Sequence, residues 1–302
     1  MATTLLIVTG ASRGIGRACA TAFASNPECK FLRSILIARS QDGLNETYEL
    51  MKQRANVAGV QLQSSNHVMD LSDLSTLEEK LKHAFRVEED EIRAFDRLIL
   101  VNNAGSLGHL GPMSDVSSLV QLREAIDLNV TSSIWLSSLF LRTFVTPLLN
   151  INNNDNNDNN DDDDDNGKDK KRMCTIVNIS SLCAVKAYKS MAVYCAGKAA
   201  RDMFHAVMAS EYEQFQNAST AGDNPTVKVL NYAPGVCESE MTNELCESET
   251  LDKGLSAFFA KTKEEKSFIQ PDDTCQRMMK LVMSGDFESG KHIDYWDLED
   301  IT

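Results

Sequence analysis

Three residues have the types and spacing needed to deliver a proton to a carbonyl oxygen. Tyr194 and Lys198 are four residues apart, so they share one face of a predicted helix, and Ser181 lies thirteen residues earlier at the end of a predicted strand. A nearby ammonium stabilises a phenolate, so Lys198 is expected to lower the pKa of Tyr194 towards neutrality. With Ser181 and Tyr194 both donating to the developing oxyanion, the pattern predicts carbonyl reduction by a hydride donor.

Asn129, in a long predicted helix, is expected to hold a water that links Lys198 to solvent. Each of these four residues also has an ordinary interpretation. A Tyr-x-x-x-Lys pair arises by chance on amphipathic helices, a serine after a strand is usually a turn former, and Asn129 also suits a helix bend. Their order behind a glycine-rich loop favours the catalytic interpretation.

That glycine-rich loop follows the first predicted strand and reads Thr-Gly-Ala-Ser-Arg-Gly-Ile-Gly over residues 9–16. Glycines let the backbone turn tightly and approach a pyrophosphate, which then lies at the N-terminus of the next helix. The spacing is G-x-x-x-G-x-G rather than G-x-G-x-x-G. The residues predicted to bind a nicotinamide dinucleotide here are Gly10, Ala11, Ser12, Arg13, Gly14, Ile15 and Gly16.

The end of the second predicted strand distinguishes the two nicotinamide cofactors. NAD-dependent enzymes normally place Asp or Glu there for the ribose 2′-hydroxyl, whereas this chain has Arg39 and Ser40. A guanidinium can pair with a 2′-phosphate through two hydrogen bonds, and Arg13 could reach the same group. Arg39 could instead be a solvated charge at a strand end. Two arginines and no acid favour NADP(H).

Further cofactor contacts are predicted after the third and fourth strands. Asp70 and Leu71 suit the adenine edge, and Asn103, within the Asn-Asn-Ala-Gly run at 102–105, suits the ribose. Asp70 could equally cap the helix that follows it. Both interpretations of Asp70 stay open at this point.

Short apolar runs alternate with longer amphipathic stretches, which is typical of βαβ units and a parallel sheet. We predict an α/β fold: one Rossmann-type, doubly wound domain over residues 1–302, with a seven-stranded, mainly parallel sheet and helices on both faces. The expected strands cover 4–9, 34–38, 61–68, 97–101, 174–179, 226–232 and 292–294. The expected helices cover 15–26, 43–57, 73–87, 116–149, 190–216 and 271–283.

The composition points to an intracellular enzyme. The formal net charge of -14 argues against a nucleic-acid partner, and half of it comes from seven aspartates in one Asn/Asp tract. This tract lies in a loop insertion at about 151–172 that we predict to be disordered. A metal-binding or interaction role for it is the alternative to a tolerated insertion. The eight cysteines show no CxxC spacing, so reduced thiols and no metal site are expected. Without a signal peptide or membrane-length apolar run, we expect a cytoplasmic protein with no membrane partner.

These motifs together resemble the short-chain dehydrogenases/reductases. The matching stretches are TGASRGIG, NNAG, the Asn129 helix, Ser181, Tyr-x-x-x-Lys and Pro234-Gly235, all in the family's order. The resemblance covers the chain except the Asn/Asp insert. It implies an NADP(H)-dependent oxidoreductase with Asn129, Ser181, Tyr194 and Lys198 as catalytic residues, Lys198 also binding the nicotinamide ribose. It further implies a homodimer paired through the long helices that flank the active site.

A narrower resemblance is to members of this family that reduce side-chain carbonyls of pterins, and it lies in NNAGSLG, NISSLCA, YCAGKAARDM, VLNYAPG and SGKHIDYWD. It implies reduction of 6-pyruvoyl-tetrahydropterin, in the last step of tetrahydrobiopterin synthesis, or of sepiapterin to dihydrobiopterin. Ser181 and Tyr194 would contact the reacting carbonyl, Gly235 would line the pterin pocket, and Asp294 would anchor the pterin ring. The segment implied to lie over the cofactor comprises Cys237, Glu238, Ser239, Glu240, Met241 and Thr242.

Three features remain open. Asp294 could be one of several acids at a strand end, near Asp297, Glu299 and Asp300. The region 243–268, expected to be a helical substrate lid, and the tail after Asp297 match the pterin reductases poorly. The alternatives to a pterin reductase are therefore a carbonyl reductase acting on diketones and a non-catalytic NADP(H)-binding protein.

Overall fold

The computed structural model describes residues 1–150, 172–218 and 225–298. Most of the predicted insertion at about 151–172, and the end of the tail after Asp297, therefore lie outside the described residues. The disorder expected for the insertion stays a prediction.

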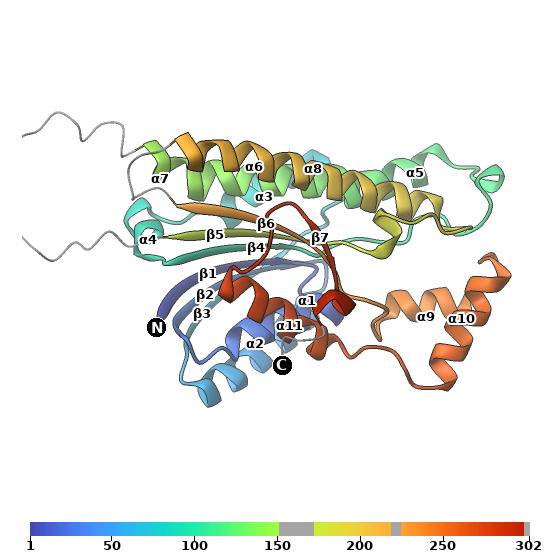
Figure 1. Ribbon diagram of the computed structural model, residues 1–302, viewed down its shortest axis with the longest axis horizontal. Helices are drawn as coiled ribbons and strands as arrows, with labels where there is room; N and C mark the ends of the chain where they lie inside the picture. The colour runs from blue at the N-terminus through green and yellow to red at the C-terminus, as the bar shows by residue number, and fades with distance from the viewer. Residues whose placement is uncertain (151–171, 219–224, 299–302) are drawn as a thin grey trace, which may run out of the picture.

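The core of the protein is one sheet of seven strands, all paired in parallel, in the order β3-β2-β1-β4-β5-β6-β7 (Figure 1). Its middle strands are apolar on both faces, since Leu5, Leu6, Ile7 and Val8 of β1 are fully buried. The predicted α/β class and Rossmann-type sheet are confirmed. The strands are β1 (Ala2–Thr9), β2 (Cys29–Ala38), β3 (Gln61–Val68), β4 (Arg97–Asn102), β5 (Met173–Ile179), β6 (Thr226–Ala233) and β7 (His292–Asp294).

Helices cover both faces of this sheet, so the architecture has three layers (Figure 1). One face packs against α1 (Gly14–Ala24), α2 (Gln41–Ala58) and α11 (Pro271–Ser284). The other face packs against α3 (Leu74–Ala84), α4 (Glu89–Ala94), α6 (Ser132–Phe140), α7 (Thr146–Asn150) and α8 (Ala192–Ala218). Each interface is a continuous apolar cluster, which fixes how the ends of the strands sit relative to the helices.

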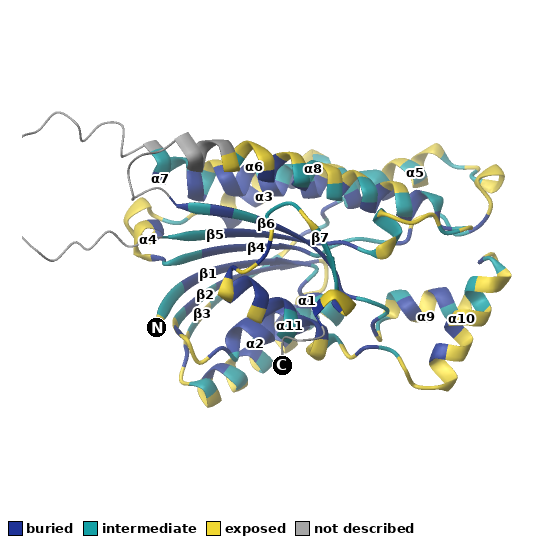
Figure 2. Cartoon of the chain, in the orientation of Figure 1, coloured by how far each residue is buried: buried dark blue, intermediate teal, exposed yellow. Residues whose placement is uncertain are grey.

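Two further helices, α9 (Glu240–Glu247) and α10 (Lys253–Glu264), stand beyond the carboxyl ends of the strands. Figure 2 shows that they alternate buried and exposed residues and that one side of each is open to solvent. Their buried residues Leu245 and Phe259 join an apolar cluster that includes Tyr194. The region predicted as a helical lid is thus helical, and α9 begins a few residues earlier than expected.

The single long helix predicted over 116–149 is interrupted by two π-helical turns. After the short 3-10 helix η1 (Met113–Asp115), α5 (Leu119–Ile126) continues through η2 (Asp127–Thr131) into α6, and η3 (Leu141–Val145) joins α6 to α7. The run Leu119–Leu149 is long and apolar enough to cross a membrane by length and composition alone. Buried core helices pass the same test, and 56% of its most apolar window is buried within the fold.

Two further differences from the sequence expectation concern β2 and α4. β2 begins at Cys29, five residues before the predicted start, because Lys30 and Arg33 interrupt the apolar pattern while Leu32 between them is fully buried. The six-residue helix α4 was not predicted, and its N-cap residue Glu88 makes no capping hydrogen bond. The short 3-10 helices η6 (Leu182–Ala184) and η7 (Tyr295–Leu298) complete the described elements.

Candidate active site

The structure brings the three residues predicted to do the chemistry together at the carboxyl end of β5. Ser181 follows β5, and Tyr194 and Lys198 lie on the first turns of α8. The ammonium of Lys198 donates to the carbonyl oxygen of Ile179 at 2.6 Å and lies 5.5 Å from the centroid of the Tyr194 ring. The Ser181 side chain lies close enough to Tyr194 to lower the pKa of its phenol. The two proposed donors to a substrate carbonyl therefore lie next to each other.

Local backbone geometry determines where the Ser181 hydroxyl lies. Ser181 is the extended N-cap residue of η6, and its Oγ accepts from the backbone N–H of Cys183 at 3.2 Å. The preceding residue, Ser180, donates its N–H to Tyr232 of β6. Because the capping bond uses Oγ as an acceptor, the hydroxyl proton remains free to donate to another oxygen.

Burial controls the protonation of the site. Burial raises the pKa of Tyr194 well above its usual range, and the Ser181 side chain and the charge of Arg201 lower it by less. Burial, followed by the charge of Arg201, lowers the pKa of Lys198 to about 7. The expectation that Lys198 brings the pKa of Tyr194 towards neutrality is thus wrong in this structure. Loss of hydration on burial is the largest cause of the pKa shift of each group.

Asn129 lies in the π-helical turn η2 and is buried. Its side chain accepts from the N–H of Ser106 and donates to the carbonyl oxygen of Ser106, each at 3.0 Å. A Cβ atom added at Gly197 would lie 3.2 Å from the Cβ of Asn129, so α8 passes close to this turn. Asn129 therefore bonds to the loop after β4 and packs closely against α8, and its predicted water relay stays a prediction.

The glycine loop has the shape of a cradle for an anion. Gly10 and Gly14 have φ angles of +66° and +52°, and a Cβ added at Gly16 would lie 2.2 Å from the carbonyl oxygen of Gly10. Arg13 is the N-cap of α1 and makes no side-chain capping bond, so it leaves the first N–H groups of that helix for a ligand. Asn103 braces the loop by donating to the carbonyl oxygen of Thr9 at 2.9 Å. These residues fit a dinucleotide pyrophosphate.

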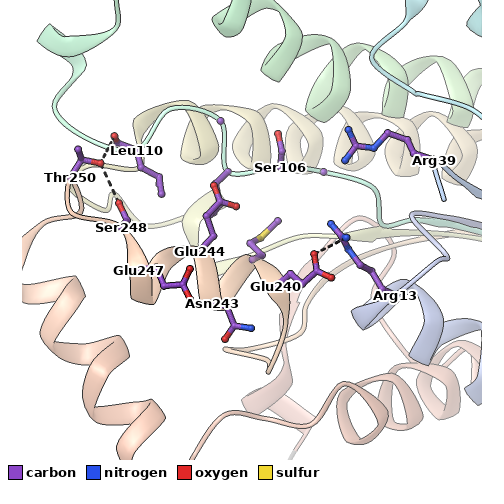
Figure 3. Close-up of a pocket in the computed structure, with 14 residues that line it drawn as sticks. Arg13, Arg39, Ser106, Leu110, Glu240, Asn243, Glu244, Glu247, Ser248 and Thr250 are labelled. Carbon is purple, nitrogen blue, oxygen red and sulfur yellow. Dashed lines mark hydrogen bonds and ion pairs between the residues drawn. The ribbon is translucent and has the colours of Figure 1, made fainter. Parts of the chain in front are cut away.

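A cleft of about 780 Å³ opens beside this loop, and both candidate phosphate-binding arginines line it (Figure 3). Arg13 forms an ion pair with Glu240 of α9 at 2.6 Å, and Arg39 lies 3.9 Å from Asp70. The side chains of Arg13 and Arg39 are 60% and 70% exposed. Both can therefore turn towards a phosphate without losing a buried contact.

Three other residues predicted to contact the cofactor make contacts within the protein itself. Asp70 accepts from the N–H and hydroxyl of Ser72, and the residue that precedes α3 is Asp73, so Asp70 is not its N-cap. Ser40 caps α2 by accepting from Gly43. The Leu71 side chain is buried in the core, which leaves its backbone for any adenine contact.

The segment predicted to cover the cofactor divides into structural and cleft-lining residues. Ser239 and Thr242 form a reciprocal capping box at the start of α9, and Thr242 also donates to the carbonyl oxygen of Cys237, which is buried. Glu240 and Met241 line the cleft opposite the glycine loop. The Glu238 carboxylate accepts from Gln270.

The residues implied to hold a pterin lie at the β6–β7 edge of the sheet. Asp294 pairs in register with Ala233, and Gly235 has a φ of +76°. A Cβ added at Gly235 would lie 2.4 Å from Ile269 and 3.6 Å from the Cβ of Tyr295. One carboxylate oxygen of Asp294 accepts from the N–H of Trp296, and the Asp294 side chain is half-buried. It is thus part of a turn at the strand end and more than a solvated acid.

The large cleft does not itself include the reacting residues. Neither it nor a second cleft of about 530 Å³ is lined by Ser181, Tyr194 or Lys198. Leu107 and Met241 nevertheless belong both to the wall of the larger cleft and to the apolar cluster around Tyr194. We place the chemistry at Tyr194, where the donors converge, and regard the cleft as the approach to it.

Sequence reasoning assigned no role to Arg201, although it belongs to the site. Its guanidinium is fully buried and donates to Ala104 and Asn102 at the end of β4 and to Asn178 in β5. It lies three residues after Lys198 and seven after Tyr194, so helical periodicity places all three on one face of α8. This spacing in the sequence could have identified Arg201 as a residue of the site.

A family model described as short chain dehydrogenase matches residues 4–150 and 167–250. Together with the sheet order and the Ser-Tyr-Lys cluster, this match shows that the chain belongs to the short-chain dehydrogenase family of oxidoreductases.

Within this family, the chain is similar to sepiapterin reductase of Mus musculus, with 32% identity over 296 residues and 96% of each chain covered. It is also similar, at 26% identity, to a benzil reductase ((S)-benzoin forming) of Bacillus subtilis, with 96% of this chain and 97% of that protein covered.

Solved structures show the same fold. The KRED1-Pglu enzyme aligns with a TM-score of 0.69 at 20% identity, covering 96% of this chain and all of that one. A variant of actinorhodin polyketide ketoreductase with NADPH aligns with a TM-score of 0.67 at 18% identity, covering 97% of each chain. The predicted family and fold are confirmed.

Proposed function

We propose that this protein is a sepiapterin reductase, which uses NADPH to reduce a side-chain carbonyl of a pterin. The observation that carries the reductase chemistry is the convergence of Ser181, Tyr194 and Lys198 at the end of β5. The similarity to mouse sepiapterin reductase along nearly the whole chain supports the pterin assignment. Sepiapterin and 6-pyruvoyl-tetrahydropterin are the proposed substrates.

The proposed reaction divides the work among the side chains. NADPH, when bound, supplies the hydride. The Ser181 hydroxyl donates a hydrogen bond to the substrate oxygen, and Tyr194 transfers its proton to the same oxygen. The raised pKa of Tyr194 keeps this acid protonated at neutral pH, which suits the direction of reduction. Lys198 donates to the carbonyl oxygen of Ile179, and this bond fixes its ammonium group close to the Tyr194 ring.

The choice of NADPH rests on the two arginines in the cleft. Arg13 and Arg39 are the basic residues that line the cleft, and Asp70 lies 3.9 Å from Arg39. Arg39→Asp should weaken NADPH binding at least about tenfold while leaving NADH binding within about twofold. Fluorescence titration with both cofactors measures this ratio. An unchanged ratio would exclude Arg39 as the 2′-phosphate ligand.

The pterin assignment rests on Asp294 at the edge strand β7. A carboxylate can accept two N–H bonds from the 2-amino-4-oxo edge of a pterin ring. Asp294→Ala should therefore raise KM for sepiapterin at least about tenfold while sparing a small diketone such as diacetyl. Asp297→Ala, three residues further on, is the control for general loss of the turn, because Asp297 accepts from the N–H of Asp294.

The second candidate is a reductase of aromatic or small 1,2-diketones. The similarity to the benzil reductase of Bacillus subtilis and the apolar wall of Leu107 and Met241 favour it. An NADPH oxidation assay that compares sepiapterin with benzil and diacetyl separates the two candidates. Efficient turnover of benzil with none of sepiapterin would replace the pterin proposal. If the protein turned over no carbonyl, it would instead be a non-catalytic NADP(H)-binding protein.

We also propose a homodimer that pairs through α5 and α8. Leu119 and Val120 on α5, and Met203 and Val207 on α8, are 50–79% exposed apolar residues on neighbouring helices. Figure 2 shows the exposed side of these helices running along one edge of the molecule. Light scattering after size exclusion should give twice the chain mass, and Val120→Glu combined with Met203→Glu should give the monomer.

A further inference from the structure

Arg201 is a cation that the fold has removed entirely from water. Its Nε donates to the Oδ1 of Asn178 at 2.7 Å, its Nη1 donates to the carbonyl oxygen of Ala104 at 2.9 Å, and its Nη2 donates to the carbonyl oxygen of Asn102. All three acceptors are neutral amide groups. A buried charge held only by neutral acceptors is costly, because it loses its hydration without gaining a direct ion pair.

These acceptors belong to a row of polar side chains that crosses the sheet. Asn102 of β4 is in register with Asn178 of β5, Asn178 with Asn231 of β6, and Asn231 with His292 of β7. Four neighbouring strands thus present polar residues at one level, close to their carboxyl ends. We call this row the polar rung.

Two consecutive residues of α8 bind the polar rung. Arg201 donates to Asn102 and Asn178, while Asp202 accepts from the amide of Asn178 at 2.9 Å and pairs with His292 at 2.7 Å. The catalytic helix is therefore attached to all the strands that carry the candidate substrate site. The attachment begins one helical turn after Lys198.

The Arg201 contacts also reach the nucleotide side. Ala104 directly follows Asn103, whose side chain donates to the carbonyl oxygens of Thr9 and Gly10 in the glycine loop. Arg201 consequently links Tyr194 and Lys198 on α8 to the segment that braces the cofactor cradle. A shift of this guanidinium would change the position of the proton donor relative to the glycine loop.

We propose that Arg201 is a positioning residue for carbonyl reduction, which holds the Tyr194–Lys198 face of α8 against the ends of β4 and β5. The inference rests on the reductase chemistry proposed above and does not depend on which carbonyl is the substrate. Its charge also acts on the two reacting groups, because it lowers the pKa of Tyr194 and of Lys198. The other groups that act on these two are Ser181 after β5, Cys183 on η6, and Cys195 and Asp202 on α8.

Two substitutions separate the geometric from the electrostatic contribution of Arg201. Arg201→Lys keeps the charge but cannot span three acceptors, and Arg201→Met removes the charge and all three bonds. The control is His205→Gln, one turn further along α8, because His205 is equally buried but bonds to Ser137 and to the Arg201 carbonyl oxygen. The assay is NADPH-dependent reduction of whichever carbonyl the unmodified protein turns over, followed across pH, with NADPH affinity measured separately.

Arg201→Lys should lower kcat about 10- to 100-fold, because small displacements of a reacting group are costly, with the pH profile near neutrality unchanged. Arg201→Met should in addition shift the pH dependence near neutrality upwards, since the loss of a nearby cation raises the pKa of Lys198 from about 7. NADPH affinity should change less than kcat. His205→Gln should retain the pH profile and most of kcat.

The proposal is overturned if Arg201→Lys retains full kcat, or if His205→Gln loses as much activity as Arg201→Lys, because a general loosening of α8 would then explain the loss. If Arg201→Met does not fold, the comparison of Arg201→Lys with His205→Gln decides alone. Failure of the proposed function gives a different result, because the unmodified protein would then reduce no carbonyl at all. The proposed role of Arg201 would be excluded together with that function.

Discussion

The Nη1 of Arg13 lies 2.6 Å from the Oε2 of Glu240, so an ion pair joins the glycine loop to α9 across the cleft (Figure 3). Both side chains are more than half exposed. A pair of this kind contributes little to stability, but it occupies the cation that a cofactor phosphate would use. The proposed binding of an NADPH phosphate to Arg13 would therefore compete with Glu240.

Glu240→Gln should accordingly tighten NADPH binding by about two- to fivefold, which corresponds to the strength of an exposed ion pair. NADH binding should change less, because NADH lacks the 2′-phosphate. Glu244→Gln, one turn further along α9 and lining the same cleft, is the matched control. Fluorescence titration gives both affinities, and equal effects of the two variants would mean that only the net charge of α9 matters.

Tyr194→Phe should reduce kcat by about 10²-fold or more, because it removes the proton donor and little else. NADPH affinity and the urea midpoint of unfolding should stay close to those of the parent. Tyr188→Phe is a useful control, since Tyr188 packs in the same apolar cluster. Steady-state assays with the preferred carbonyl measure the effect. A fall of less than about threefold would assign the proton transfer to another group.

Gly16→Ala should disrupt the cofactor cradle, whereas Gly14→Ala should only strain it. The new methyl at Gly16 would lie 2.2 Å from a backbone oxygen and 2.6 Å from the Asn103 amide, while the one at Gly14 meets nothing within 4 Å. We expect a loss of about 1–3 kcal/mol in the free energy of unfolding for Gly16→Ala, together with loss of NADPH binding. Gly14→Ala should cost about 1 kcal/mol, because its φ is +52°. Urea unfolding ranks the two, and the reverse order would contradict this geometry.

His205 should make stability depend on pH. Burial, as the largest cause, lowers the pKa of His205 to about 4 from 6.5. Between these values the unfolded chain binds more protons than the folded one, so the free energy of unfolding rises as pH rises through this window. The contribution is up to about 3 kcal/mol. His205→Gln should flatten the difference between pH 5 and pH 7 in urea unfolding, and an equal slope in both proteins would show that other groups dominate.

Much of this structure could be predicted because its signals are local. The apolar run at Leu5 to Val8 and the glycines that follow it predict a buried strand and a phosphate-binding turn without knowledge of the rest of the chain. The four-residue spacing of Tyr194 and Lys198 likewise predicts a shared helix face. Each of these depends on one periodicity or one turn.

The features that escaped prediction depend on several elements at once. Arg201 bonds to two strands far from it in sequence, and an arginine inside a helix ordinarily faces water. The high pKa of Tyr194 arises from burial by α9 and the loop after β4, which no single motif reveals. The apolar pattern did not predict the π-helical turn at Asn129, because the helix continues on both sides of this turn.

The strand that carries Asp294 is three residues long and lies at the margin of the sheet, bonded to β6 alone among the strands. The glycine loop, in contrast, directly follows β1, which lies in the middle of the sheet. An exchange of the residues from His292 onward would therefore disturb one strand pairing, that of β6 with β7, and would leave the glycine loop as it is. Engineers seeking new carbonyl selectivity have a natural crossover point here, just ahead of β7.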